Sequence, residues 1–386
     1  MLIGDTRFIE RDGAYWTSGN LRRPLVEALA RTFGSVKVAM RVREATPVEW
    51  ENVPHADIIR VPGVEFVHLP TWNGPSGWFG SRAAVGRILR RHIPTVDVCV
   101  ARLPCPPAGL SVALAGRLKV PVIAHVLGDP LFSWIDRVPT AVGRHFVTSV
   151  IASSFSRALS SCDSVLSTSR GVLMPYMPDV SGVGRLADTS LTDPDYIKPR
   201  QRTRPHVLFF CASRIVPLKN FDLLLHALRI VVKHCPQVQC TIAGDGPDLA
   251  RLRLLTSDLG LESHVTFLGF VRDRLRLRQH YEDADVAFLL SRSEGLPLAV
   301  LEAMAAGLPL LVSEIPQNRE VADEMGAIFV GCDDRDACAA AIRSLITDPD
   351  RRRKMAQHNF ELAGAFHVDV QVRRLAASVE QVLSHG

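Results

Sequence analysis

Two glutamates, Glu294 and Glu302, stand in a stretch whose other residues favour burial. The stretch SEGLPLAVLEAMAAGLPLLVS spans residues 293–313 and separates the two acids by seven residues. A buried carboxylate is costly unless it has a partner. Since a carboxylate only accepts hydrogen bonds and a vicinal diol presents two donors, the pair predicts contacts with a sugar and a ribose. The alternative is a structural ion pair between Glu302 and Arg214 or Arg292.

Two cations follow the first apolar run of the second half, HVLFFCAS. Arg214 comes directly after this run, and Lys219 stands at the start of the predicted helix KNFDLLLHALRIVVKH. A lysine at a helix N-terminus is disfavoured by the helix dipole, which prefers anions there. An external anion that contacts both cations and the free N–H groups of the helix would reverse this penalty. The pattern therefore predicts a phosphate-binding segment.

The segment GDGP, residues 244–247, follows the next apolar run. Gly244 and Gly246 allow the backbone to approach a ligand closely. An ordinary strand-to-helix turn explains the same residues equally well.

All of these residues follow predicted strands in a half of the chain that alternates strand and helix. The predicted strands span residues 206–213, 238–244, 264–270, 284–290, 308–313 and 327–331. Such alternation predicts a parallel sheet covered by helices on both faces. In sheets of this kind ligands bind beyond the carboxyl ends of the strands, where the charged and glycine-rich residues stand.

The first half of the chain shows the same alternation. Its predicted strands span residues 35–42, 65–70, 96–103, 120–127 and 164–169, and its predicted helices 21–34, 107–118 and 145–162. A turn-rich stretch at 179–205 is typical of a linker. The predicted fold is α/β, with two doubly wound Rossmann-like domains facing across a cleft. The expected boundaries are 1–180, a linker at 181–204, 205–365, and a C-terminal helix at 366–386 that packs back toward the first domain.

The composition agrees with a two-domain enzyme, because 386 residues exceed the size of one hydrophobic core. Eight cysteines without a CxxC pair indicate small buried side chains in a reducing compartment. The sequence contains no run of eighteen apolar residues, so it predicts no membrane-spanning helix. The charged N-terminus argues against a secretory signal, so we expect a cytoplasmic protein.

Positive charge is concentrated in the first half, where residues 1–200 hold 23 Lys and Arg against 17 Asp and Glu. Part of it lies in GSRAAVGRILRRHIP, residues 80–94, which combines apolar Val85, Ile88 and Leu89 with a basic face. The basic residues of this stretch are Arg82, Arg87, Arg90, Arg91 and His92. This pattern predicts peripheral contact with an anionic inner membrane surface that presents a lipid-linked acceptor. An ordinary solvated helix face is the alternative.

Four blocks of the second half resemble family-four retaining glycosyltransferases, which have the GT-B fold. SEGLPLAVLEAMAAGLPLLVS is similar to the E-x7-E signature of that family, and ASRIVPLKNFDLLLHAL to its phosphate-binding Arg/Lys segment. IAGDGPDLARL and VTFLGFV resemble the next two blocks in order and spacing. The resemblance covers residues 206–365 closely.

The resemblance implies a role for each donor-side residue. Arg214 and Lys219 would neutralise the diphosphate of a nucleotide sugar, Glu294 would hold the hydroxyls of the donor sugar, and Glu302 would bind the ribose. The remaining implied contacts are Gly244 and Gly246 along the donor cleft, Gly295, Leu296 and Leu298 near the sugar and phosphate, and Gly269 and Val271 against the base. Residues 205–365 would thus form the nucleotide-sugar-binding domain.

The first domain resembles the acceptor side of the family less closely. Gly19 stands where an acceptor loop would approach closely, and His125, which ends VPVIAH, where a histidine would reach the donor sugar. A structurally satisfied histidine explains His125 equally well. The loop at 128–130 would lie on the acceptor side, although a simple turn explains it too. Asp12 and Arg102 are further candidates on this side.

The implied reaction moves a sugar from a nucleoside diphosphate to a hydroxyl of a glycan, lipid-linked or small-molecule acceptor with retention of configuration. Preorganised cations and helix dipoles would stabilise the charge that builds on the leaving phosphate. The leaving phosphate itself would deprotonate the acceptor. No Asp-x-Asp motif stands at a strand end, so we expect no metal and no cofactor besides the donor substrate. Such an enzyme would act in cell-surface polysaccharide or glycoconjugate synthesis.

Three other functions remain as alternatives. A nucleotide-sugar epimerase shares the two-domain fold but would not be expected to carry the E-x7-E block in this form. A non-catalytic subunit would not need intact Arg214, Lys219, Glu294 and Glu302. A dinucleotide oxidoreductase is disfavoured because no GxGxxG motif follows a strand with an acid about twenty residues later.

Overall fold

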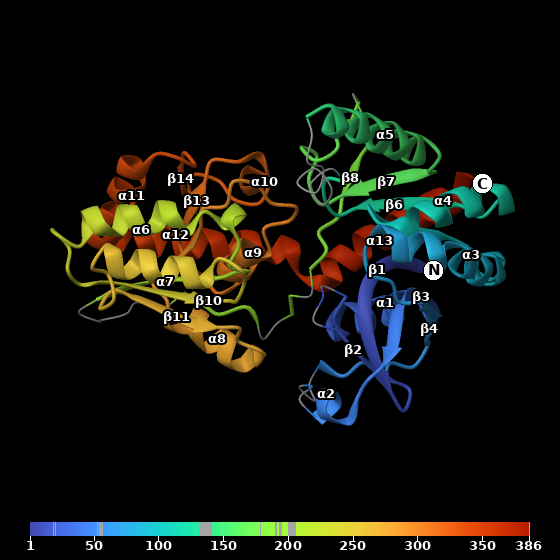
Figure 1. Cartoon of the computed structure of the whole chain (residues 1–386), viewed down its shortest axis with the longest axis horizontal. Coiled ribbons are helices and arrows are strands. Elements are labelled where there is room, and N and C mark those ends of the chain that lie inside the picture. Colours follow the sequence, from blue (N-terminus) through green and yellow to red (C-terminus); the bar gives the residue numbers. More distant parts are fainter. Residues whose placement is uncertain are drawn as a thin grey trace. The chain divides into compact units, whose positions relative to one another are not determined.

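The computed structural model divides the chain into two compact units (Figure 1). It describes residues 1–385 except 18, 20, 52, 54–56, 131–140, 178, 190, 193, 194 and 200–205, and it describes no side chain for 75 and 141–147. Unit 1 comprises Met1–Ser190 together with Val368–Gly386, and unit 2 comprises Leu191–His367.

Unit 1 is built on an eight-stranded sheet in the order β4-β3-β1-β5-β6-β7-β8, with β2 paired to β1. Its strands are β1 (Leu2–Arg11), β2 (Ala14–Trp16), β3 (Val36–Glu44), β4 (Val64–Leu69), β5 (Cys99–Leu103), β6 (Val122–Val126), β7 (Ser164–Ser167) and β8 (Gly184–Arg185). Neighbouring strands are parallel except β1 and β2. The sheet is thus the parallel one that strand–helix alternation predicts.

Strand β1 pairs with three strands. It pairs with β3 along most of its length, with an irregularity in the register between Ile3 and Arg7. On its other side Leu2 and Ile3 pair with β5, and the far end, from Ile9, pairs with β2. The β1–β2 turn is made by Asp12 and Gly13, both with positive φ. The run DTRFIERDGAYW is too charged to look like a buried strand, so the sequence did not predict this hairpin.

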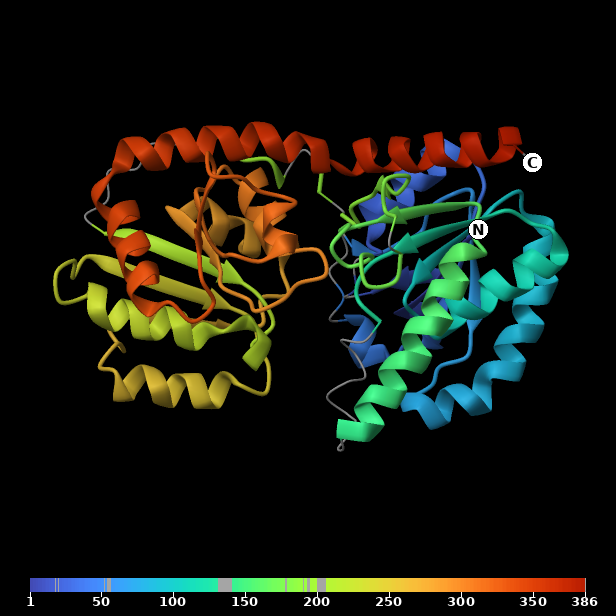
Figure 2. The same ribbon diagram turned by 90° about the horizontal axis from the view of Figure 1, so that it is seen from above.

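Helices cover both faces of the unit 1 sheet. The helices are α1 (Arg23–Phe33), α2 (Pro47–Glu51), α3 (Gly74–His92), α4 (Pro106–Leu118), α5 (Ala141–Ser160) and α13 (Val368–His385). Helices α1 and α13 pack on one face, and α3, α4 and α5 cover the other (Figure 2). Val372 and Leu375 of α13 join the core formed with Leu25 and Leu29 of α1, so the last helix completes this unit.

Unit 2 contains a six-stranded parallel sheet in the order β11-β10-β9-β12-β13-β14. The strands are β9 (Val207–Ala212), β10 (Val238–Ala243), β11 (Val265–Gly269), β12 (Val286–Leu289), β13 (Leu310–Ser313) and β14 (Ala327–Val330). The order reverses between β9 and β12, and this point is where open α/β sheets bind ligands.

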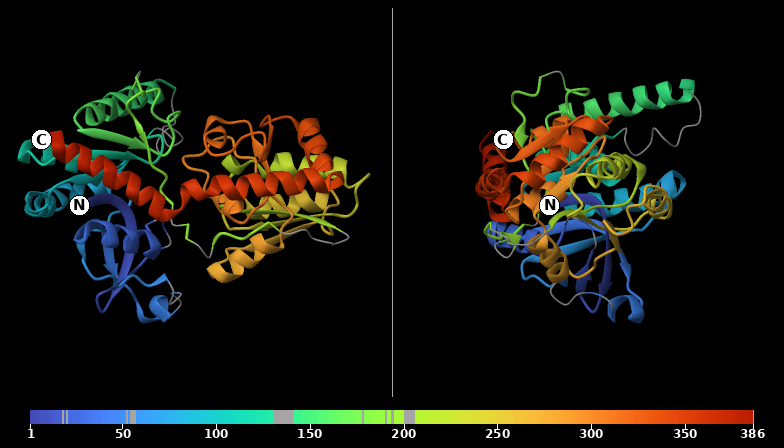
Figure 3. Two further views of the ribbon diagram at one scale, coloured as in Figure 1. Left: turned by 180° about the vertical axis from the view of Figure 1, so that it is seen from behind. Right: turned by 90° about the vertical axis from the view of Figure 1, so that its left-hand side faces the viewer.

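Helices also cover both faces of the unit 2 sheet (Figure 3). They are α6 (Phe221–Val231), α7 (Leu249–Asp258), α8 (Arg274–Asp283), α9 (Leu298–Ala305), α10 (Pro316–Arg319), α11 (Arg335–Thr347) and α12 (Pro349–Ala363). Helices α6 and α11 pack together on one face, and α9 and α12 pack together on the other. Among the described helices, none is both long and apolar enough to cross a membrane.

The unit boundary lies later in the chain than the sequence suggests. Strand β8 pairs with β7, and the Leu186 amide donates to the Ser167 carbonyl at 3.0 Å, so this segment belongs to unit 1 and not to a linker. Several residues of the expected linker, among them 200–204, lie outside the described part of the chain.

Candidate active site

The charged residues that the sequence singles out in unit 2 follow β9 and β12, the two strands at the reversal of sheet order. Arg214 and Lys219 follow β9, while Arg292 and Glu294 follow β12. Because parallel strands end at the same edge, these side chains gather beyond it. The Arg292 amide donates to the Leu218 carbonyl at 2.9 Å and fixes the two segments to each other.

Lys219 and Glu294 form an ion pair across these segments. The Lys219 Nζ lies 2.5 Å from Glu294 Oε1, and the two side chains are only 18% and 9% exposed. The carboxylate of Glu294 thus supplies the negative charge that offsets the unfavourable position of Lys219 next to a helix N-terminus. Each group reduces the desolvation cost of the other, and both are held in place before a ligand arrives.

Arg214 contrasts with this pair because its side chain is exposed. Within the described residues no carboxylate lies within ion-pair distance of its guanidinium. An arginine in this state presents a fork of donors that matches a phosphate or carboxylate.

Gly244 and Gly246 allow β10 to approach the Arg214 segment. A Cβ on Gly244 would lie 1.8 Å from the Ser213 carbonyl oxygen, and one on Gly246 would lie 2.0 Å from that of Ile215. The Ile215 amide donates to the Asp245 carbonyl at 2.9 Å, which closes this contact. The close approach that the glycines permit is therefore made by the chain's own backbone, which positions Arg214.

The turn before α9 contributes two unpaired backbone donors. Among the described residues, the N–H groups of Gly295 and Leu296 have no hydrogen-bond partner. Leu298 was expected to offer a third donor, but its N–H donates to the Leu296 carbonyl at 2.8 Å. Pro297 has no N–H, so fewer backbone donors are available to an anion than the sequence suggests.

Glu302 has a partner that sequence reasoning missed. The Tyr281 hydroxyl of α8 donates to Glu302 Oε2 at 3.0 Å. Burial, and next the neighbouring carboxylate, raise the pKa of Tyr281, so the hydroxyl stays protonated and donates. Neither Arg214 nor Arg292, the two structural partners that the sequence suggests for Glu302, contacts it: Arg292 pairs with Asp333 at 2.5 Å, and Arg214 has no carboxylate partner among the described residues. No sequence pattern links residues on two separate helices in this way.

Asn220 is a second residue that the sequence did not single out. It has a left-handed backbone with φ of 54° and follows Lys219 directly. Its side-chain amide donates to the Cys332 carbonyl at 2.8 Å, and it is buried. Asparagine tolerates this backbone conformation, and its amide anchors the Lys219 segment to the loop after β14.

The loop after β11 carries the residues expected against a base. Gly269 has φ of 73°, and its carbonyl accepts the Gly244 amide at 2.8 Å, so the β10 and β11 ends are tied together. Val271 is partly buried, and Phe270 between them is 63% exposed. This exposed aromatic ring is a feature of the loop that the sequence did not predict.

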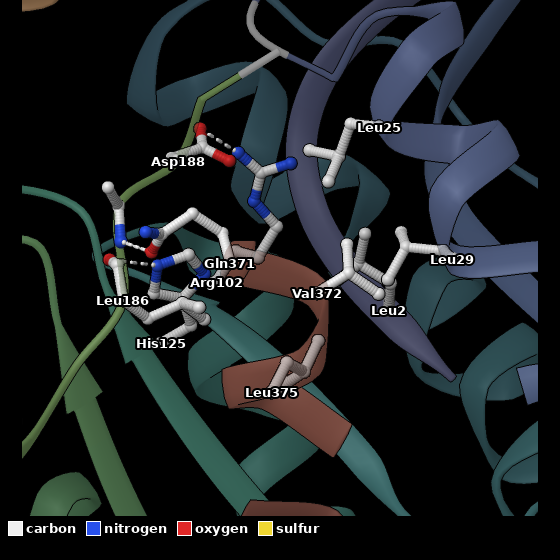
Figure 4. A pocket seen from close by; sticks show the side chains of 11 residues that line it. Leu2, Leu25, Leu29, Arg102, His125, Leu186, Asp188, Gln371, Val372 and Leu375 are labelled. Atoms are coloured by element: carbon white, nitrogen blue, oxygen red, sulfur yellow. Dashed lines mark hydrogen bonds and ion pairs between the residues drawn. The ribbon is translucent and has the colours of Figure 1, made fainter. Parts of the chain in front are cut away.

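His125 lies within β6, and its ring is buried in a small pocket of unit 1 (Figure 4). Its Nε2 lies 3.2 Å from the Leu186 carbonyl oxygen, and burial lowers its pKa to about 4. The neutral ring therefore holds the segment after β8. This placement favours the structural explanation of His125 over contact with a sugar.

Arg102 and Gln371 hold the same segment at the two following residues. Arg102 forms a buried ion pair with Asp188, and the Ala187 amide donates to Gln371 Oε1 at 2.7 Å. Figure 4 shows these side chains converging on residues 186–188 from β5, β6 and α13. Three consecutive residues are thus each fixed by a different side chain, a role that the sequence did not predict for Arg102.

The other candidates of unit 1 have local partners. Asp12 is an exposed turn residue, and the Gly19 amide donates to Thr17 Oγ1 at 3.0 Å. The residues on either side of Gly19 lie outside the described part of the chain. Asp129 accepts a hydrogen bond from the Tyr176 hydroxyl at 2.6 Å. No cluster of three or more metal-ligating side chains occurs among the described residues.

Comparison with known proteins shows which proteins this site resembles. Residues 195–361 match the model of the group 1 glycosyl transferases. A GDP-mannose-dependent alpha-(1-6)-phosphatidylinositol monomannoside mannosyltransferase of Mycobacterium tuberculosis is 29% identical over 327 residues, 74% of this chain and 81% of its own. Its Mycolicibacterium smegmatis counterpart is 33% identical over 180 residues, 44% of this chain and 47% of its own.

Solved structures share the fold over the whole chain. Anabaena HepE in complex with UDP superimposes with a TM-score of 0.71 at 18% identity, covering 99% of this chain and 100% of its own. The sucrose-phosphate synthase of Thermosynechococcus elongatus gives a TM-score of 0.75 at 18% identity, covering 100% and 99%. The comparisons give no support to the epimerase alternative. The chain is therefore a glycosyltransferase with the GT-B fold, and its residues 195–361 are similar to the group 1 glycosyl transferases.

Proposed function

We propose that the carboxyl edge of the unit 2 sheet binds the diphosphate of a nucleotide-sugar donor. The observation that carries this proposal is the Lys219–Glu294 pair at 2.5 Å, set at the reversal of strand order. Next to it in the chain are the exposed Arg214 and the N–H groups of Gly295 and Leu296, which have no hydrogen-bond partner in the described part of the chain. A diphosphate would accept hydrogen bonds from all of these donors.

The remaining donor contacts follow from the same edge. Glu294 accepts from hydroxyls of the donor sugar while its second role is to orient Lys219. Glu302 accepts from the ribose diol, and the loop with Gly269 and Val271 contacts the base. Gly244 and Gly246 line the site because they allow the β10 end to pack against the backbone next to Arg214.

Transfer in this scheme occurs with retention of configuration. The acceptor hydroxyl oxygen bonds to the anomeric carbon as the bond from that carbon to the leaving phosphate oxygen breaks. The hydroxyl proton passes to a phosphate oxygen. Arg214 and Lys219 stabilise the negative charge that accumulates there, so the reaction needs no metal ion. Turnover should therefore be unchanged when a chelator such as EDTA is added.

The acceptor is a hydroxyl of a glycan or lipid-linked molecule, in cell-surface polysaccharide or glycoconjugate synthesis. Support comes from relatives whose names specify such acceptors. They include the phosphatidylinositol monomannoside mannosyltransferase and an alpha-monoglucosyldiacylglycerol synthase of Streptococcus pneumoniae, which is 33% identical over 140 residues. A role for His125 at the donor sugar is not part of this proposal.

Helix α3 contacts an anionic inner membrane surface in this proposal. Val85 and Leu89 of the helix, and Ile93 directly after it, are fully buried in the core of unit 1. The solvent side carries Phe79, which is 70% exposed, and four exposed arginines that have no carboxylate partner among the described residues. These arginines are Arg82, Arg87, Arg90 and Arg91. An aromatic ring beside unpaired cations suits the interface of an anionic bilayer.

The donor proposal is tested by calorimetry with UDP, GDP and ADP and their sugars. We expect one nucleoside diphosphate to bind and an Arg214→Ala variant to bind it at least tenfold more weakly, as a lost charge-assisted hydrogen bond predicts. Equal binding by the variant would remove Arg214 from the site.

The membrane proposal is tested by co-sedimentation with vesicles of anionic lipid. A variant with Arg87, Arg90 and Arg91 changed to Ser should lose binding, since each charge contributes about 1 kcal/mol. The matched control changes Arg351, Arg353 and Lys354, exposed cations at the start of α12, to Ser. Equal loss in both variants, or none in either, would leave α3 as a solvated helix face.

A further inference from the structure

Tyr281 fixes one oxygen of the Glu302 carboxylate from within the core of unit 2. Its hydroxyl lies 3.0 Å from Glu302 Oε2, and the residue is only 5% exposed. The ring packs edge-to-face on Phe210 of β9, with centroids 4.9 Å apart. A phenol held by packing at its ring keeps its O–H in one place, so the carboxylate is oriented before any ligand binds.

Helix α8, which carries Tyr281, is itself anchored at its start. Asp273 caps the helix by accepting the Leu275 amide at 2.9 Å, and Arg274 pairs with Asp195 at 2.8 Å. The loop at 269–273, proposed above to contact the base, runs directly into this helix. Helix α8 therefore connects the loop proposed to contact the base with Glu302, the acid proposed for the ribose, through the Tyr281 hydroxyl.

We propose that Tyr281 is a positioning residue for ribose recognition. It holds the Glu302 carboxylate in the orientation that accepts hydrogen bonds from the ribose diol, and so sets the preference for ribonucleotides over 2′,3′-dideoxynucleotides. An oriented carboxylate lowers the ordering cost of binding, whereas a mobile one must be ordered by the ligand. This inference rests on the proposed role of Glu302.

The test compares a nucleoside diphosphate with its 2′,3′-dideoxy counterpart by calorimetry, using UDP or GDP, whichever binds more tightly. Wild-type protein should prefer the ribonucleotide. In a Tyr281→Phe variant, which keeps the buried ring, we expect this preference to fall by roughly tenfold, while affinity for the dideoxynucleotide changes little. If the hydroxyl has a purely structural role, the Tyr281→Phe variant should bind both nucleotides more weakly by the same factor.

Two further variants make the result decisive. Tyr196→Phe is the matched control, because it removes a hydroxyl that donates to the Ala363 carbonyl at 2.8 Å in the same unit, and it should leave the preference unchanged. Glu302→Gln should abolish the preference. If Glu302→Gln abolishes it and Tyr281→Phe does not, the positioning role is overturned and the ribose contact stands. If neither variant changes it, the ribose role of Glu302 falls as well.

Discussion

In unit 2 the charged side chains beyond β9 and β12 remain at the sheet edge, whereas in unit 1 those of β5 and β6 are enclosed. Lys219 and Glu294 are 18% and 9% exposed, with the exposed Arg214 following the same strand as Lys219. Arg102 and Asp188 are 4% and 6% exposed, and with His125 they hold the chain's own backbone.

The two sheets share the same order around their reversal points, so topology alone does not explain this difference. What differs is the segment that occupies the edge. In unit 1, residues 186–188 and the start of α13 cover the polar side chains. A polar residue near a strand end is therefore a candidate for chemistry only where the chain itself does not satisfy it.

The largest effect is expected in unit 1, at the enclosed ion pair. Arg102→Met should lower the free energy of unfolding by about 3–5 kcal/mol, because it leaves Asp188 buried without its cation. Thermal and denaturant unfolding measure this loss. Nucleotide affinity, measured on the folded fraction, should stay at the wild-type value. A weakened nucleotide affinity without loss of stability would contradict the division of roles between the two edges.

At the unit 2 edge, Lys219→Ala and Glu294→Ala should each reduce kcat/KM by about 100- to 1000-fold, as removal of a preorganised charge does. Each single variant also leaves one charge of a largely buried pair without a partner, so some stability is lost. The double variant should recover part of that stability but no activity. Wild-type turnover in either single variant would remove the pair from the site.

The enclosed histidine predicts a pH dependence of stability. The pKa of His125 is lowered to about 4 in the folded protein, against about 6.5 in the unfolded chain. Between these values the unfolded state binds more protons, so stability is complete above pH 6.5 and falls as the pH drops toward 4. The loss amounts to about 3 kcal/mol.

A His125→Gln variant should remove this part of the pH dependence. Urea unfolding at pH 7 and pH 5, for wild type and variant, gives the comparison. An unchanged difference between the two pH values in the variant would show that other groups cause it.

Two glycine substitutions, one at each sheet edge, should differ by a smaller effect on stability and nucleotide binding. Gly246→Ala should destabilise the protein by about 1–3 kcal/mol and weaken nucleotide binding, because its Cβ would lie 2.0 Å from the Ile215 carbonyl and displace the Arg214 segment. Gly128→Ala, after β6, is the control, since no heavy atom of the described residues lies within 4 Å of its Cβ position. Similar nucleotide affinities in the two variants would mean that the Arg214 segment is not held by this contact.

The strands of unit 2 were predictable because buried parallel strands are continuous apolar runs, such as the one at 206–213. The first hairpin was not, because its charged residues alternate irregularly, and the two-residue β8 is too short to leave a pattern. The sequence also identified the candidate site residues one by one, namely Arg214, Lys219, Glu294 and Glu302.

Their partners were not identified from the sequence. The Lys219–Glu294 and Tyr281–Glu302 contacts join residues on different strands and helices, and no local spacing encodes such contacts. The same holds for His125, since whether a histidine near a strand end is open or enclosed depends on α13, which lies at the far end of the chain.

The Gln371–Ala187 hydrogen bond belongs to a unit that is not contiguous in the chain. Unit 1 takes Val368, Val372 and Leu375 of α13 into the core beside α1, so it cannot complete its packing until α13 has been synthesised. Unit 2 is contiguous, and all of it leaves the ribosome earlier. We therefore expect unit 2 to fold first during translation, while the α1 face of unit 1 stays uncovered and depends on chaperones until α13 emerges.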